Sequence, residues 1–102
     1  MATIGTIRVD DQDLDLIRGT YPHGGATSIR LIGNDEDGCP SPWGCLTVNI
    51  PGTDLASNEV LVKTWSENEQ FRGPALASGH FADTGRRIRT GFVAAEVWRL
   101  LV

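Results

Sequence analysis

The sequence has little cysteine and no long apolar run, and both shortages narrow the possible settings of the protein. Two cysteines, Cys39 and Cys45, are too few for a disulfide scaffold, so we expect free thiols in a reducing cytoplasm. No stretch approaches the roughly 20 apolar residues that a membrane-spanning helix requires. The N-terminus also lacks the basic start and apolar core of a signal peptide. These absences predict a soluble, unprocessed protein.

Signatures of catalysis and of cofactor binding are missing as well. Gly24-Gly25 is not followed by Lys-Ser or Lys-Thr, so the chain has no phosphate-binding glycine loop. Serine, histidine and aspartate are present, but without the spacing of a nucleophile motif. We therefore expect a protein that is not an enzyme and holds no cofactor. A small hydrolase or metal-dependent enzyme that uses His23 or His80 is the alternative.

Residues that bind metals are present but poorly spaced. Cys39, Cys45, His23 and His80 include the ligand types of zinc, yet they lack the two close ligand pairs of a structural zinc site. Asp35-Glu36-Asp37-Gly38 starts like a calcium loop, but the bidentate glutamate that should follow is absent. The sequence therefore favours packed or exposed thiols and a solvated turn over a metal site.

Length and composition indicate one globular domain, covering residues 1–102. A chain of 102 residues can enclose one hydrophobic core. Apolar residues make up 40% of it and charged residues 22%, close to the values of ordinary globular domains. The net charge of -4 disfavours non-specific binding to nucleic-acid phosphates, which needs clustered lysine and arginine. An acidic protein is better matched to a partner with a basic surface.

Residues 60–69 predict a strand that passes directly into a helix. Side chains alternate with period two from Val60 to Trp65, as in a strand with two different faces. Ser66 and Glu69 have the spacing of a capping box, in which each side chain bonds the backbone amide of the other residue. This stretch is therefore expected to set the framework of the fold.

The helix is expected over about 67–79, with a kink or break at Gly73-Pro74 and an end at Gly79. Strands are predicted at 4–9, 14–18, 27–33 and 43–50. A short hairpin of 81–83 and 86–89 is predicted around Thr84-Gly85, and a last strand at 91–102, where a helix is the alternative. Residues 34–38 read as a turn that Pro40 and Pro42 extend into a rigid loop. Together these elements predict an α+β domain, in which a twisted, mostly antiparallel sheet carries one kinked helix on one face.

Charged clusters are the most informative surface feature. Glu67 and Glu69 fall in the first turn of the expected helix, where the helix dipole accounts for them. The other acidic residues are either solvated turns or a phosphate-like surface for a nucleic-acid-binding partner. That partner-binding hypothesis covers two turns: Asp10, Asp11, Asp13 and the neighbouring Asp15 in one, and Asp35, Glu36 and Asp37 in the other.

One basic cluster and one tryptophan complete the expected partner-binding surface. Arg86, Arg87 and Arg89 either bind an acidic groove or make a hairpin soluble. Trp43, beside Pro42, is either an interface anchor or a core residue, because tryptophan is enriched among binding hot spots. Trp65 and Trp98 are assigned to the core.

Four segments resemble, in order and spacing, a family of short uncharacterised proteins from plasmids, phages and other bacterial mobile elements. They are Tyr21-Pro22-His23-Gly24-Gly25, residues 46–51, residues 62–69 with Ser66-Glu67-Asn68-Glu69, and residues 84–92 with Thr90-Gly91-Phe92. The chain departs from this family at Gly73-Pro74 and in the loop from Cys39 to Trp43.

Mobile-element proteins of this size include inhibitors of host defence, among them anti-CRISPR proteins. Together with the absence of catalytic spacing, the resemblance implies a stoichiometric inhibitor that occupies a surface of a host protein or ribonucleoprotein complex. From the net charge and the lack of a long apolar run, we expect no direct binding to nucleic acid or to a membrane. Family alone does not fix function. The alternative to an inhibitor is a structural or regulatory module of a larger assembly. It would be a monomer or a homodimer that pairs exposed sheet edges.

Overall fold

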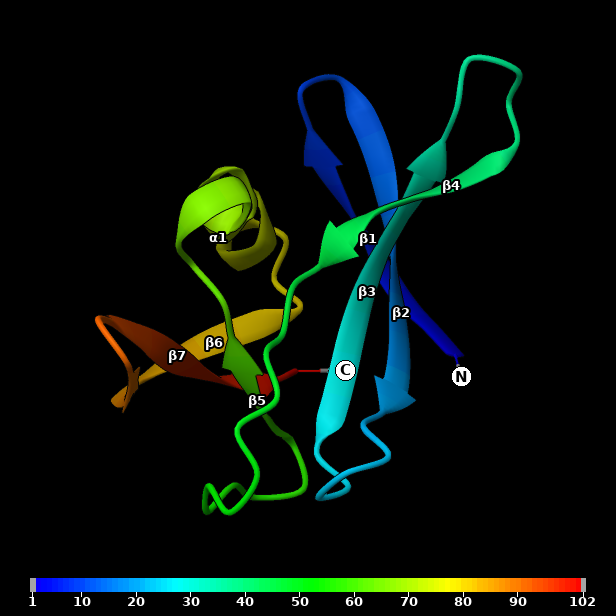
Figure 1. The fold of residues 1–102 in the computed structure, drawn as a ribbon. Coiled ribbons are helices and arrows are strands. Elements are labelled where there is room, and N and C mark those ends of the chain that lie inside the picture. The colour runs from blue at the N-terminus through cyan, green and yellow to red at the C-terminus, as the bar shows by residue number, and fades with distance from the viewer. Residues whose placement is uncertain (1, 102) are drawn as a thin grey trace.

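The computed structural model describes residues 2–101, which form seven antiparallel strands in two sheets and one helical segment (Figure 1). The first sheet has the strand order β1-β2-β3-β4 and the second β5-β7-β6. The strands are β1 (Ala2–Val9), β2 (Gln12–Thr20), β3 (Thr27–Asn34), β4 (Pro40–Cys45), β5 (Glu59–Val62), β6 (Phe81–Thr90) and β7 (Val93–Leu100). The predicted α+β class is therefore confirmed, with two sheets in place of the single sheet expected.

Residues 46–48 join the two sheets. The Leu46 amide donates to the Ile29 carbonyl at 2.9 Å, while the Leu46 carbonyl accepts from the Lys63 amide at 2.9 Å. An isolated bridge pairs Thr47 with Val62. The chain thus leaves the edge of the first sheet and becomes the neighbour of β5, as strands do at the corners of packed sheets.

The prediction of one central strand over 43–50 and a rigid loop before it was wrong. The observed strand, β4, begins at Pro40, contains Pro42 and ends at Cys45. It is an edge strand of the first sheet. Proline has no amide to donate, so an edge strand tolerates it where one side of the strand has no ladder partner.

The main core lies between the two sheets and under the helix. Trp98 on β7 is fully buried, with its ring centroid 5.5 Å from that of Phe81, and the helix contributes Phe71 and Ala75. Val60 faces this core, so the predicted alternation of β5 is confirmed. The remaining core residues are Ile7, Val9, Leu14, Leu16, Ile29, Leu31, Leu46, Val62 and Leu100.

A second, smaller apolar cluster covers the opposite face of the second sheet. Leu61, Ala95 and Val97 are buried there beneath the segment that follows β4. Trp65 is only partly buried and packs against this cluster, so it lies at the margin of a core. The core assignment of Trp98 is confirmed, because Trp98 is fully buried in the main core. The side chains that cover the cluster are Val48, Ile50, Leu55, Trp65 and Ile88.

The predicted capping box does not form. Strand β5 ends at Val62, and a 3-10 turn, η1 (Ser66–Asn68), precedes helix α1 (Glu69–Ala77). Ser66 has a φ of 57°, and its backbone carbonyl accepts the Glu69 amide that the serine hydroxyl was expected to accept. The buried Asn68 side chain takes over the anchoring role, donating to the carbonyls of Cys45 and Lys63 at 2.7 and 3.2 Å.

Helix α1 is continuous through Pro74, so of the predicted kink or break at Gly73-Pro74 the break is absent. The helix ends at Ala77. Gly79 lies just beyond it with a φ of 82°, a left-handed conformation that glycine adopts without steric cost. The prediction that Gly79 terminates the helix is therefore confirmed.

The short hairpin predicted around Thr84-Gly85 was also wrong. Strand β6 continues through these residues and pairs with β7 on both sides of them, with a register shift between Asp83 and Arg87. Gly85, at a φ of 87°, lies in this bulge. The predicted C-terminal strand is confirmed as β7, and its last predicted residue, Val102, lies outside the described residues.

Candidate functional site

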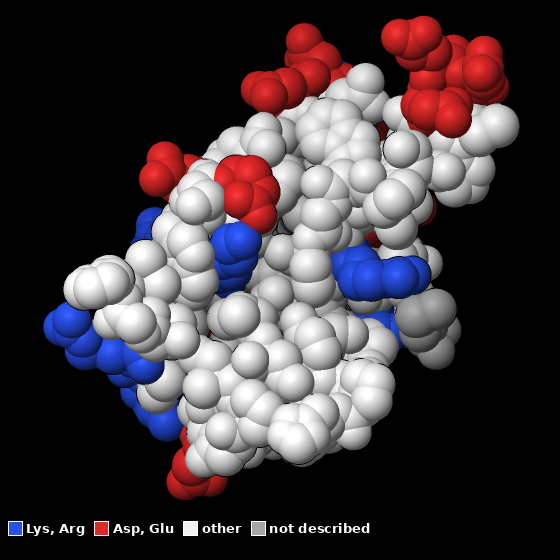
Figure 2. Space-filling view, in the orientation of Figure 1, with Lys and Arg blue, Asp and Glu red and all other residues white. Residues whose placement is uncertain are grey.

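Two turns carry acidic residues at the same end of the first sheet, and we call them the acidic tips. The β1–β2 turn holds Asp10 and Asp11, and the β3–β4 turn holds Asp35, Glu36 and Asp37. Since β1–β4 are successive antiparallel strands, the first and third turns must lie at the same end of the sheet, as Figure 1 shows. Figure 2 shows acidic side chains gathered over this end.

The first acidic tip is a two-residue hairpin turn. Val9 pairs with Gln12, which leaves only Asp10 and Asp11 to reverse the chain. Their φ angles of 49° and 65° place both in the left-handed region that type I′ turns require. Aspartate adopts this conformation more readily than most residues, although glycine is favoured. Both carboxylates are exposed as a result.

The second acidic tip has one structural carboxylate and two free ones. The Asp35 carboxylate accepts hydrogen bonds from the amides of Asp37 and Cys39, each at 2.9 Å. These bonds stabilise the turn. Glu36 and Asp37 are exposed, and no ion pair joins them to any residue of the described chain.

Asp13 and Asp15, which the sequence grouped with the first tip, lie along β2 instead of at the turn. Asp13 forms an ion pair of 3.1 Å with Arg8 on the neighbouring strand. Asp15 accepts a long hydrogen bond of 3.4 Å from the Thr6 hydroxyl. Asp10, Asp11 and Asp15 are therefore the acids of this region without an ion pair in the described chain, and of these only Asp10 and Asp11 lie at the turn.

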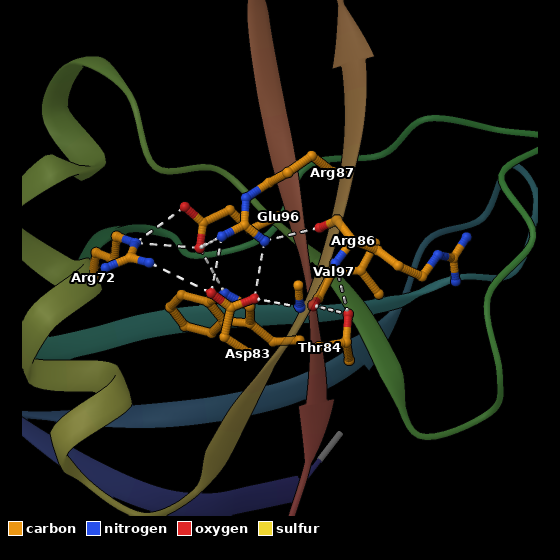
Figure 3. Close-up of polar contacts among 9 residues, drawn as sticks. Arg72, Asp83, Thr84, Arg86, Arg87, Glu96 and Val97 are labelled. Carbon is orange, nitrogen blue, oxygen red and sulfur yellow. Dashed lines mark hydrogen bonds and ion pairs between the residues drawn. The ribbon is translucent and has the colours of Figure 1, made fainter.

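One of the predicted basic residues on β6, Arg87, belongs to an ionic network with the helix and with β7 (Figure 3). Arg87 binds Asp83 through two bonds of 2.9 Å and lies 3.6 Å from Glu96. Arg72 of α1 binds the same Glu96 at 3.0 Å. The Trp98 indole N–H also donates to Glu96 at 2.9 Å, so this carboxylate connects the helix, the sheet and the core.

The charges of this network change the proton affinity of its members. The hydrogen bond from Arg87 is the main cause that lowers the pKa of Asp83 below its ordinary value, and the Gly85 amide adds to it. The same bond raises the pKa of Arg87 above its ordinary value. Both groups therefore stay charged at neutral pH, and the network acts as a link between elements.

The other two predicted arginines differ from each other. Arg86 is 3.4 Å from the Glu59 carboxylate and donates to the Asp54 carbonyl at 3.1 Å. Arg89 is exposed and forms no ion pair with the described residues. Two of the three arginines are thus occupied within the chain, and Arg89 is the one left to meet a partner.

Trp43 packs against the margin of the main core and is only partly exposed. Its indole covers Gly33, where an added Cβ atom would lie 2.6 Å from the indole nitrogen. The same added Cβ atom would lie 2.8 Å from a methyl carbon of Leu14, which is in the core. Trp43 therefore packs at the margin of the core, and its role as an interface anchor stays a prediction.

The possible metal ligands lie on separate elements. His23 and Cys39 are exposed in different turns, while the His80 ring packs over Gly5. Cys45 is half-buried. Residues 2–101 contain no group of three histidine, cysteine, aspartate or glutamate side chains that could hold a metal ion.

A partly buried polar cluster around Tyr21 was missed by the sequence analysis. The Tyr21 hydroxyl lies 2.9 Å from that of Thr47 and 3.5 Å from the Cys45 sulfur. Thr47 also accepts the Ile29 amide at 3.1 Å. Burial is the main cause that raises the pKa of Tyr21 to about 12, so the phenol stays protonated. The signal in the sequence was Thr47, between Leu46 and Val48. In a strand with alternating apolar and polar residues, a buried threonine looks the same as an exposed one.

A cavity of about 290 Å³ was missed as well. It lies between the β2–β3 turn and the loop before β5, at the opposite end of the first sheet from the acidic tips. Figure 2 shows mostly uncharged side chains over this end of the molecule. Its lining consists of Gly24, Gly25, Ala26, Thr27, Thr53, Leu55, Ala56, Ser57 and Glu59.

The helical segment within residues 2–101 is too short and too polar to cross a membrane. Comparison of the chain with protein-family models, with curated proteins and with solved structures gave no match.

Proposed function

We propose that this chain is a non-catalytic binding protein that occupies a basic surface of a partner with its acidic tips. This proposal rests on four exposed acids at one end of the first sheet, which form no ion pair with the described residues. They are Asp10, Asp11, Glu36 and Asp37. Several like charges at one end create a field that attracts a cationic surface and speeds encounter with it. Surfaces that bind nucleic-acid phosphates have this cationic character.

The biological setting that we propose is a mobile genetic element in the cytoplasm of a bacterial host. Its support is the resemblance of residues 21–25, 46–51, 62–69 and 84–92 to small mobile-element proteins. In that setting, the partner is a host protein or ribonucleoprotein complex of a defence system such as CRISPR-Cas. The chain would then be an anti-CRISPR or related anti-defence inhibitor that acts by occupying the surface stoichiometrically.

The absence of an assembled reaction centre supports binding over catalysis. A hydrolase needs a nucleophile hydrogen-bonded to a base that a third group orients. Neither the His23 nor the His80 side chain forms a hydrogen bond to another side chain in residues 2–101. The enzyme alternative therefore has no geometry to support it, whereas the two acidic tips lie at the same end of one sheet.

The test removes the charges of the tips and leaves the turns intact. The tip variant carries Asp10→Asn, Asp11→Asn, Glu36→Gln and Asp37→Asn, and it retains Asp35 because that carboxylate holds its turn together. Asparagine suits the positive φ angles of the first tip. The matched control removes four other carboxylates, through Asp15→Asn, Asp54→Asn, Glu67→Gln and Glu69→Gln.

Affinity capture from a bacterial lysate then compares wild type, tip variant and control. We expect one basic protein or complex to be captured by wild type and control and lost with the tip variant, at unchanged melting temperature. Equal capture by the tip variant would contradict the proposal. For the defence setting, transformation of a strain whose CRISPR-Cas system targets the incoming plasmid should rise with wild type and not with the tip variant.

A further inference from the structure

Phe92 is fully exposed, with a relative accessibility of 103%, at the turn between β6 and β7. Thr90 pairs with Val93, so only Gly91 and Phe92 reverse the chain. Gly91 has a φ of 64°, whereas Phe92 is outside the left-handed region, and this turn geometry requires glycine but no aromatic residue. The fold therefore gives Phe92 no structural role, and exposure of a phenyl ring in water is unfavourable.

The cavity near the β2–β3 turn has the size for a phenyl ring. Its volume of about 290 Å³ exceeds the roughly 150 Å³ in which an engineered protein cavity binds benzene. Its walls include Gly24, Gly25, Ala26 and Ala56, whose small or missing side chains leave room for a ring. Leu55 adds an apolar contact.

An exposed positive charge lies beside the turn, and an exposed negative charge lies beside the cavity. Arg89, close to Phe92 on β6, is exposed and has no ion pair within residues 2–101. Asp54 is exposed in the loop that lines the cavity, between two lining residues. On the cavity wall, Oε1 of Glu59 accepts the Ala56 amide and Arg86. The turn is thus apolar and positive. The cavity combines small and apolar walls with the hydroxyl groups of Thr27, Thr53 and Ser57. Asp54 at its rim is negative, whereas the charge of Glu59 is paired with Arg86.

The turn cannot fill the cavity of its own chain, because the two lie apart. In Figure 1 the β6–β7 turn, in orange, is well separated from the loops after β2 and before β5. The β6–β7 ladder extends up to the turn, through Thr90 and Val93, and holds it in place. Only another molecule can bring a phenyl ring into this cavity.

We propose that two copies of this chain associate by insertion of Phe92 of one copy into this cavity of the other, with Arg89 facing Asp54. If both copies do so at once, the result is a closed dimer. If only one does, the contact repeats head to tail. The contact involves neither acidic tip, so it is independent of the proposed function and leaves the tips free.

The first experiment is sedimentation of the purified chain over a wide concentration range. The weight-average mass of wild type should rise above the 11.0 kDa of one chain as concentration increases. Phe92→Ser should weaken this association at least tenfold. Leu101→Ser is the matched control, since Leu101 is the other exposed large apolar residue of the described chain and should leave association unchanged.

The second experiment fills the cavity and then restores one contact. Ala56→Trp places a ring in the cavity from an exposed position and should weaken association as much as Phe92→Ser does. A mixture of the two variants should associate again, because one supplies the phenyl ring and the other the open cavity. Unchanged melting temperatures would show that both variants are folded.

Three results would overturn this proposal. They are a wild-type chain that stays monomeric at every concentration, an association that Phe92→Ser leaves intact, and a mixture of the two variants that fails to associate. Because these measurements use the purified chain alone, any of them leaves the proposed role of the acidic tips in place. Conversely, loss of partner capture by the tip variant would not affect self-association.

Discussion

The two sheets hold carboxylates of the same kind in opposite ways. In the second sheet, Asp83, Glu96 and Glu59 each meet at least one arginine of the same chain. At the acidic tips of the first sheet, no carboxylate forms an ion pair with the described residues. The Glu96 side chain is 11% exposed, whereas the acidic residues of the tips are all exposed.

This difference separates charges that stabilise the fold from charges that the fold does not use. A carboxylate withdrawn from water needs partners, because an unpaired buried charge is strongly unfavourable. Glu96 has three such partners, in Arg72, Arg87 and Trp98. The tips give the fold no comparable benefit, and Asp10 and Asp11 even require a backbone conformation that glycine would adopt more easily. The proposed binding role would account for the acids that the turns themselves do not use.

The largest expected effect comes from Glu96→Ala. We expect a loss of about 2–3 kcal/mol in the free energy of unfolding, because the buried Trp98 N–H and two arginines lose their shared acceptor. Urea denaturation would measure it. The matched variant at a tip, Glu36→Ala, should change the same quantity by less than about 0.5 kcal/mol. Similar losses at both positions would remove the distinction between the two regions.

A smaller effect concerns Asp83 and pH. Its pKa in the folded protein lies below the ordinary 3.8, so its stabilising contribution is present above that pH and is lost as pH falls through the lowered value. Asp83→Asn should remove about 1 kcal/mol at neutral pH and flatten the loss of stability below pH 3.8. Arg87→Gln removes the main cause of the shift and should flatten the same acid limb. An unchanged limb in both variants would place the acid sensitivity elsewhere.

Much of the fold was predictable because local patterns determine it. The alternation of Val60, Leu61 and Val62, and the glycine after α1, worked as local signals. The capping box failed because a positive φ at Ser66 lets its backbone carbonyl, not its hydroxyl, receive the Glu69 amide. Sequence spacing alone does not reveal this choice.

The candidate site was predictable only as far as its residues lie in turns. Asp10, Asp11 and the acids of the β3–β4 turn were found because turns expose charge. The roles of Arg86 and Arg87 were not, because their partners come from β5, β7 and the bulge of β6, and only strand register brings these together. Pro40 was misassigned for a related reason, since whether a strand lies at an edge depends on the whole sheet.

The next prediction concerns the conformational cost of the first tip. Asp11→Gly should raise the free energy of unfolding by about 0.5–1 kcal/mol, because glycine relieves the φ of 65° at this position. It should also weaken partner capture by removing a tip charge. Asp13→Gly is the control, since Asp13 lies in an extended strand paired to Arg8 and should lose stability instead. A loss of stability in both variants would show that Asp11 stabilises its turn.

The smallest effect on stability is expected at the second acidic tip. It tests most directly whether the carboxylates of the tips differ from those of the second sheet. Glu36→Gln together with Asp37→Asn should change the free energy of unfolding by less than about 0.5 kcal/mol, because neither carboxylate has an ion pair in the described chain. Binding to the captured partner should weaken, and its dependence on salt should become shallower, because fewer charges are left for salt to screen. Affinity measured at low and high salt would test this. A salt dependence equal to that of wild type would mean that the partner does not contact this tip, and the first tip would then carry the interaction alone.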